Sequence, residues 1–179
     1  MSRSLRRGAI AALVLAIAPL SACAASNDAE TLQVRPDNAA ASIGTTLKLN
    51  NILLVTKAAE GADQSESGPA AVSVNISNAG STAQVLKSVT VGDAGTAEFT
   101  GPDGGTVREI TVPAGGSVLL GGPGQPSVRV TDAKVQRGGF APVTFSFDSA
   151  GSVKTEAAVV SGTGDYSSFA PSAPAAAGS

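Results

Sequence analysis

Sulfur and imidazole groups are almost absent from this chain of 179 residues. Cys23 is the single cysteine, Met1 is the single methionine, and the sequence has no histidine. A disulfide needs a second cysteine, and a nucleophilic thiol or hydroxyl is normally activated by a neighbouring histidine. These counts exclude an internal disulfide and any Ser-His-Asp or Cys-His arrangement. The role of Cys23 therefore has to follow from the residues around it.

The residues before Cys23 have the pattern of a secretory signal. Three arginines near the start precede an uninterrupted apolar run at residues 9–20, which is followed by the small residues Ser21 and Ala22. A basic start, a short apolar run and a small-residue cleavage site are typical of such signals. The run is shorter than the roughly 20 apolar residues that a membrane-spanning helix needs. We expect residues 1–22 to be a signal peptide that is removed.

The four residues Leu20-Ser21-Ala22-Cys23 resemble the bacterial lipobox, Leu-[Ala/Ser]-[Gly/Ala]-Cys. In lipoproteins with this motif the cysteine thiol takes a diacylglyceryl group, and cleavage leaves that cysteine as the first residue. The resemblance implies that Cys23 is a lipidation site with a palmitate-type lipid anchor. Two acyl chains make membrane attachment stable. It therefore implies a protein on the extracytoplasmic face of the cell membrane.

The net charge of the processed chain limits the classes of partner that we expect it to bind. Signal cleavage would remove three of the twelve basic residues and none of the fourteen acidic ones, so the mature chain is mildly acidic. Nucleic-acid binding needs a clustered Lys/Arg patch, and the sequence has no basic run. We expect no nucleic-acid partner and no cofactor. The membrane, reached through the lipid anchor on Cys23, is the expected partner, beside an envelope protein or a cell-wall polymer.

The acidic residues are scattered, mostly beside turn glycines or on polar faces of strands. A hard-cation site from Asp63 and Glu66, or from Asp93 and Asp103, has no EF-hand-like spacing to support it. A pair of carboxylates could in principle perform acid–base hydrolysis. We expect these acids to be solvated, and we expect no catalytic residue and no metal ligand.

Short strands joined by Gly/Pro turns dominate the middle of the chain. Val, Ile and Phe alternate with polar residues around residues 72–77 and 143–148, which is typical of half-buried strands. We therefore expect an all-β fold, an antiparallel β-sandwich of cupredoxin-like or immunoglobulin-like type, at residues 45–160. A lipidated tether is expected at residues 23–44, and a disordered low-complexity tail, whose two aromatic residues could dock on the domain, at 161–179. The expected core residues are Val72, Val74, Ile76, Val143, Phe145 and Phe147.

Four segments of this domain resemble the periplasmic copper chaperone family PCuAC, which has a cupredoxin-like sandwich. They are AAVSVNISNAGSTAQVLKSVTV, AEFT, ITVPAGGSVLL and FSFDSAGSVKTEAAV. The copper ligands of that family are histidines and methionines, which are soft or borderline ligands suited to copper. Their positions fall here at Thr100, in the loop GPDGG, and at Pro126 and Val128. The resemblance implies the fold, but the copper site is not carried over.

Three functional hypotheses follow. The favoured one is a membrane-anchored bacterial surface lipoprotein, not an enzyme, whose degenerate copper-chaperone-like domain is a binding or interaction module. The alternative is a metal-handling envelope protein, related to copper chaperones, in which carboxylate and backbone oxygens replace the lost ligands. A hydrolase that uses a carboxylate pair remains a third hypothesis. The residues leave the ligand open, although loops are the usual place for it.

Overall fold

The computed structural model describes residues 39–57, 65–94 and 96–171. These residues form eleven strands and one short 3-10 helix, so the expected all-β class is confirmed. Val, Ile, Thr and Phe are frequent in the strands because branched and aromatic side chains pack well on a pleated surface. The elements are β1 Ala39–Ile43, β2 Leu47–Thr56, β3 Ser65–Asn78, β4 Gln84–Val91, β5 Glu98–Thr100, β6 Thr106–Val107, β7 Ile110–Val112, β8 Gly116–Leu120, β9 Ser127–Gln136, β10 Phe140–Phe147, β11 Gly151–Ser161 and η2 Gly164–Phe169.

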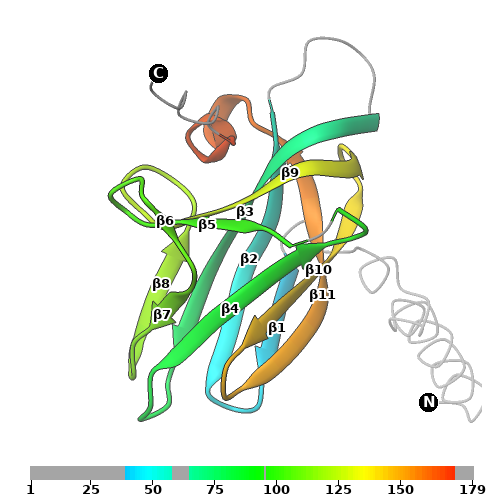
Figure 1. Cartoon of the computed structure of the whole chain (residues 1–179). Coiled ribbons are helices and arrows are strands. Elements are labelled where there is room, and N and C mark those ends of the chain that lie inside the picture. Colours follow the sequence, from blue (N-terminus) through cyan, green and yellow to red (C-terminus); the bar gives the residue numbers. More distant parts are fainter. Residues whose placement is uncertain (1–38, 58–64, 95, 172–179) are drawn as a thin grey trace, which may run out of the picture. The chain divides into compact units, whose positions relative to one another are not determined.

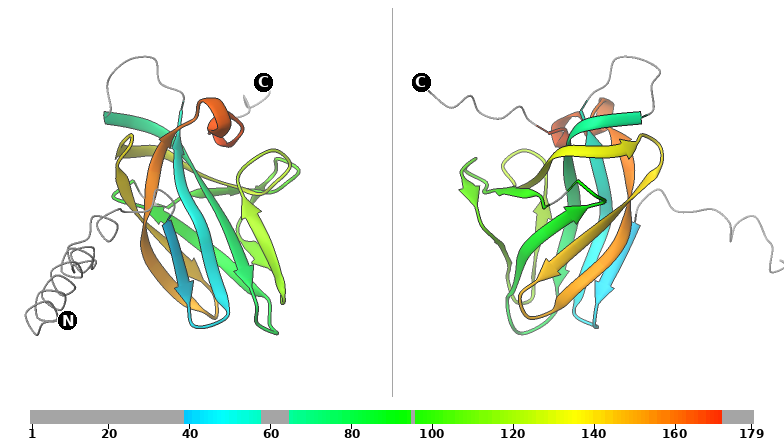
Figure 2. Two further views of the ribbon diagram at one scale, coloured as in Figure 1. Left: turned by 180° about the vertical axis from the view of Figure 1, so that it is seen from behind. Right: turned by 45° about the vertical axis from the view of Figure 1, so that its right-hand side comes forward.

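The strands form one strongly curled sheet. Its order is β6-β5-β9-β3-β2-β11-β10-β4-β7, with β1 paired to β2 and β8 paired to β3. β6 and β7 stand at opposite ends of this order, yet only Arg108 and Glu109 separate them in the sequence. The two ends of the sheet are therefore close together, and its strands surround a common interior (Figures 1 and 2).

One pair of strands departs from the antiparallel pattern that we expected. β2 and β11 run parallel, with Leu54 opposite Val159, whereas the other strand pairs are antiparallel. Antiparallel neighbours can be joined by a tight turn, whereas parallel neighbours need a long connection. β2 and β11 lie at opposite ends of the described chain, so no hairpin dictates their direction. They are direct neighbours in the middle of the strand order.

The core lies inside this curled sheet and matches the prediction. All six residues expected in the core are buried, with no more than 5% of any side chain exposed. They belong to a single hydrophobic cluster to which both halves of the sheet contribute, for example Leu49 of β2 and Leu86 of β4. Burial of this kind is the main stabilising force for a chain without disulfides.

A bulge in β2 decides which of its side chains face the core. The pairing of β2 with β3 shifts between Asn50 and Leu53, and Asn51 there has a φ of 53°. The core-facing residues are odd-numbered before the bulge, as at Leu49, and even-numbered after it, as at Ile52. One extra residue is needed for this change, because side chains alternate between faces with a period of two. The bulge therefore directs Leu53 to the outer face.

The structure differs from the expected boundaries in three places. β1 begins at Ala39, inside the expected tether, and η2 lies at Gly164–Phe169, inside the expected tail, which begins at Ser161, the last residue of β11. Residues 107–112, which alternate like a single strand, do not form one, because Val107 pairs with β5 whereas Ile110 pairs with β4. The chain crosses from one end of the sheet order to the other at this point.

The expected signal peptide, Cys23 and residues 172–179 lie outside the described residues. In the part of the chain that the structure describes, no helix is long and apolar enough to cross a membrane.

Candidate functional site

The positions that the PCuAC resemblance assigns to copper ligands come together at one corner of the sheet. Thr100 at the end of β5 is opposite Ser127 at the start of β9, so Thr100 and Pro126 belong to neighbouring strand ends. Val128 is opposite Phe99, and its side chain is fully buried in the core. The structure thus places these positions at one site, but their side chains are a hydroxyl, a pyrrolidine ring and an isopropyl group.

The turn between β5 and β6 closes this corner through its own hydrogen bonds. The Gly101 N–H donates to the Gly105 carbonyl at 2.7 Å, and the Gly104 N–H donates to the Gly101 carbonyl at 3.0 Å. The exposed Asp103 accepts the Gly105 N–H at 3.2 Å. Asp103 therefore acts as a turn residue, as Asp commonly does.

No oxygen-rich metal cluster replaces the missing ligands in the described residues. Groups of three or more His, Cys, Asp or Glu side chains with metal-binding geometry are absent there. Of the acids considered as hard-cation ligands, Asp93 and Asp103 lie on exposed turns, whereas Asp63 lies outside the described residues. The side chain of Glu66 likewise lies outside the described part of the structure.

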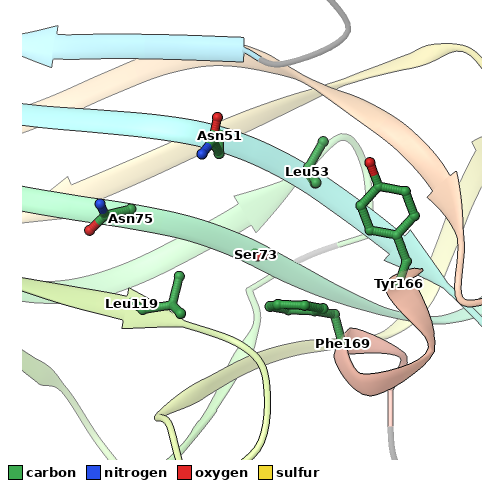
Figure 3. Close-up of a pocket in the computed structure, with 7 residues that line it drawn as sticks. All are labelled: Asn51, Leu53, Ser73, Asn75, Leu119, Tyr166 and Phe169. Atoms are coloured by element: carbon green, nitrogen blue, oxygen red, sulfur yellow. The ribbon is translucent and has the colours of Figure 1, made fainter. Parts of the chain in front are cut away.

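A second candidate site is a pocket of about 450 Å³ on the outer face of the sheet (Figure 3). Three strands, β2, β3 and β8, contribute its floor, and η2 contributes one wall. Its volume lies within the range of about 300–1,000 Å³ that is usual for small-molecule sites. The lining residues are Asn51, Leu53, Ser73, Asn75, Leu119, Tyr166 and Phe169.

Strand register explains why these residues share one surface. Leu53 of β2 is opposite Ser73 of β3, and Asn75 of β3 is opposite Leu119 of β8. Because neighbouring residues of a strand point to opposite faces, Ser73 and Asn75 point outward while Val74 between them is buried in the core. The bulge in β2 gives Leu53 the same outward direction.

The wall formed by η2 depends on a pair of glycines in the β8–β9 connection. A Cβ atom on Gly121 would lie 3.3 Å from Cδ1 of Phe169, and one on Gly122 would lie 3.2 Å from its Cε1. Both glycines have a φ of 89°, a conformation that other residues rarely adopt. Phe169 can therefore pack closely on this connection, with its ring pointing toward Leu119 in Figure 3.

The chemistry of the pocket is mixed and uncharged. Two asparagine amides, a serine hydroxyl and a phenol supply polar groups, and two leucines and two aromatic rings supply apolar surface. Leu119 and Tyr166, which are 40% and 39% exposed, are the two large hydrophobic residues exposed in the described part of the chain. Both lie at this pocket.

Sequence reasoning found only part of this site. Tyr166 and Phe169 were expected to be able to dock on the domain, and Phe169 does pack on the glycine pair. Asn51, Asn75 and Leu119 were missed, because each lies in a strand pattern that by itself indicates only a polar or partly exposed face. Outside this pocket, the pKa of the exposed Lys87 is raised, because its ammonium group donates a hydrogen bond to Glu109.

Solved structures support the fold. The chain resembles the copper-bound PCuAC domain from PmoF2, with a TM-score of 0.57 and 22% identity over 69% of this chain and 98% of that domain. It also resembles the apo PCuAC domain from PmoF1, with a TM-score of 0.57 and 24% identity over 69% of this chain and 99% of that domain. The curved sheet described above is thus the PCuAC fold.

Sequence comparison identifies the family. No curated protein matches the chain significantly in sequence. The sequence model of the LpqE-like lipoproteins matches residues 47–159, which cover most of the described chain from β2 through β11. The chain therefore belongs to the LpqE-like lipoprotein family.

Proposed function

We propose that this protein is a lipid-anchored envelope protein whose PCuAC-like domain binds a partner without catalysing a reaction and without carrying copper. The observation that carries this proposal is the corner formed by β5 and β9. The positions that the resemblance to PCuAC assigns to copper ligands fall there, at Thr100, Pro126 and Val128. The fold resembles that of copper-binding domains, whereas these side chains cannot bind copper.

The coordination chemistry of copper explains why these side chains argue against copper binding. Cu(I) is bound by thiolate, thioether or imidazole groups, and imidazole also suits Cu(II). With Met1 in the expected signal peptide, the mature chain would contain no methionine and no histidine. Cys23 would be its only sulfur group, and lipidation would convert that sulfur to a thioether at the end of the tether.

The proposed lipid anchor is supported by the sequence and by the family. The signal-like residues 1–22 and the lipobox at Cys23 support attachment, and membership of a lipoprotein family supports a place in the cell envelope. With its thiol acylated, Cys23 would be unable to serve as a nucleophile or as a thiolate ligand.

A non-catalytic role is supported by the composition of the pocket. Its lining contains no carboxylate, no histidine and no cysteine. The Ser73 hydroxyl therefore has no base beside it in the lining, and general acid–base catalysis needs such a positioned group. A pocket that offers hydrogen bonds and apolar surface, but no titrating pair, is suited to binding.

The alternative is metal handling through oxygen ligands. Asp103 is the carboxylate within the GPDGG loop, where one of the PCuAC ligands would fall, but its Oδ1 already accepts the Gly105 N–H. This turn contact favours a structural role. The copper experiment below also tests this alternative if Cu(II) is titrated alongside Cu(I).

The test is a metal competition assay on residues 24–179 with a blocked amino terminus. We expect no uptake of Cu(I) from a chromogenic chelator of ordinary strength, and no Cu(II) uptake under matched conditions. Thr100→Ala should behave in the same way as the wild type. Stoichiometric uptake of either ion would restore a copper-handling function and would contradict the proposal.

A further inference from the structure

We propose that the pocket bounded by β2, β3, β8 and η2 binds an uncharged sugar residue, as part of an oligosaccharide or a polysaccharide. This inference goes beyond the proposed function, because it names a ligand class and uses a different surface from the copper positions. It depends neither on the lipid anchor nor on the absence of copper binding.

The absence of charge in the lining selects a neutral ligand. None of the seven lining residues is Asp, Glu, Lys or Arg. A charged ligand that entered this pocket would lose hydration without gaining an opposite charge, which is costly. Phosphate groups, carboxylates and ammonium groups are therefore poor occupants.

The polar groups of the lining disfavour a purely apolar ligand. Ser73 is only 7% exposed, and Asn75 stands beside it on the outer face of β3. An acyl chain placed over these side chains would remove their water without replacing its hydrogen bonds, which is unfavourable for each buried polar group. The ligand should instead bring hydroxyl or amide groups to them.

The amide of Asn75 suits a sugar in particular. An asparagine side chain offers an acceptor oxygen and a donor nitrogen side by side. Two neighbouring hydroxyls of a pyranose ring can donate to one and accept from the other. Asn51 presents the same pair of groups, although it already takes part in an interaction within the protein.

The aromatic wall provides the complementary surface. The two faces of a pyranose ring carry C–H groups, which pack on the face of an aromatic ring, while its hydroxyls point outward around the rim. Tyr166 and Phe169 present rings from η2, opposite polar groups on the sheet (Figure 3). Tyrosine is suited to such a position because its ring is apolar and its hydroxyl is polar.

The position of the pocket argues against an extended peptide. Peptides that bind by strand addition need an open strand edge. The floor of the pocket is instead β3, which pairs with β2 on one side and with β8 on the other, so a peptide strand could add only to the outer edge of β8, on the side away from β3. A proline-rich peptide could use an aromatic groove without strand pairing, so that ligand is included as a competing outcome.

The experiment uses the full lipidated chain in a zwitterionic detergent that contains no sugar. Saturation-transfer NMR and calorimetry are carried out with maltotriose, cellotriose, mannotriose and triacetylchitotriose. Tyr166→Ala should weaken binding of the best trisaccharide about tenfold, because the stacking surface is lost. Asn75→Ala should weaken it at least two- to tenfold, which is the effect expected for the loss of a single hydrogen bond, and Tyr166→Phe should keep most of the affinity.

Thr111→Ala, which alters an exposed residue of β7 away from the pocket, is the matched control and should bind as the wild type does. Thermal unfolding of each variant distinguishes loss of binding from loss of fold. The proposal is overturned if no trisaccharide binds, or if binding is unchanged in both Tyr166→Ala and Asn75→Ala. Binding of a proline-rich peptide that is lost in Tyr166→Ala, without any sugar binding, would assign the pocket to peptides and would also overturn it.

Discussion

Replacing Phe145 by alanine tests whether the curled sheet has the core described above. Phe145 lies in the middle of β10, opposite Val89 of β4 and Val153 of β11. Its side chain is completely buried within the hydrophobic cluster. The substitution removes a whole ring from a place that both halves of the sheet share.

The expected loss is large compared with the stability of a domain. Deleting a fully buried phenylalanine side chain costs about 3–5 kcal/mol, because the transfer free energy is lost and a cavity remains. Domains are typically stable by about 5–15 kcal/mol. With a urea m-value of about 2 kcal/mol/M, the midpoint of unfolding should fall by roughly 1.5–2.5 M.

The measurement is urea unfolding of residues 24–179, followed by circular dichroism. Phe169→Ala is the matched control, because it removes the same atoms from a half-buried position outside the core cluster. We expect the control to lose at most about half as much free energy of unfolding. The core assignment would be wrong if Phe145→Ala cost less than about 0.5 kcal/mol, or no more than Phe169→Ala.

Three further predictions concern the anchor, an ion pair and the pocket wall. Cys23→Ser should accumulate as unprocessed precursor or leave the membrane fraction, and incorporation of labelled lipid at the wild-type level would refute the lipobox assignment. Glu109→Gln should lower the pKa of Lys87 toward 10.5, as followed by side-chain NMR against pH, because the hydrogen bond that keeps Lys87 protonated is lost. Any stability from this pair is present at pH values below 10.5 and is lost as Lys87 deprotonates at higher pH. Because an exposed ion pair contributes little, Glu109→Gln should change the free energy of unfolding at pH 7 only slightly. Gly162→Ala should displace η2, because its Cβ would lie 2.6 Å from both the Thr56 carbonyl oxygen and the Ala170 Cβ; an unchanged Tyr166 fluorescence spectrum would speak against this.

Local patterns in the sequence were sufficient to predict the all-β class and much of the core. The alternation at Val72, Val74 and Ile76 places three side chains on one face, and all three are buried. This works because side-chain direction along a strand has a period of two, whatever the strand pairs with. The absence of histidine is likewise a property of composition that no fold can change.

Pairing between distant segments was decided only by the tertiary structure. The parallel pair of β2 and β11 joins the two ends of the described domain, and no turn signal encodes it. The bulge at Asn51 is defined by the pairing of β2 with β3. Its sign along β2 is that the core-facing residues change from odd to even numbers.

The pocket shows the same limit most clearly. Its residues come from three strands and a 3-10 helix, and Asn51 and Phe169 come from opposite ends of the described domain. The sequence determined that this chain has strands, that it lacks histidine, and that two aromatic residues follow the last strand. These residues form one site only because β8 pairs with β3 and Phe169 packs on Gly121 and Gly122 in the tertiary structure. The physical reason is that the pattern within a strand specifies the face of the sheet toward which each side chain points. Which strands become neighbours depends instead on contacts between residues far apart in the chain.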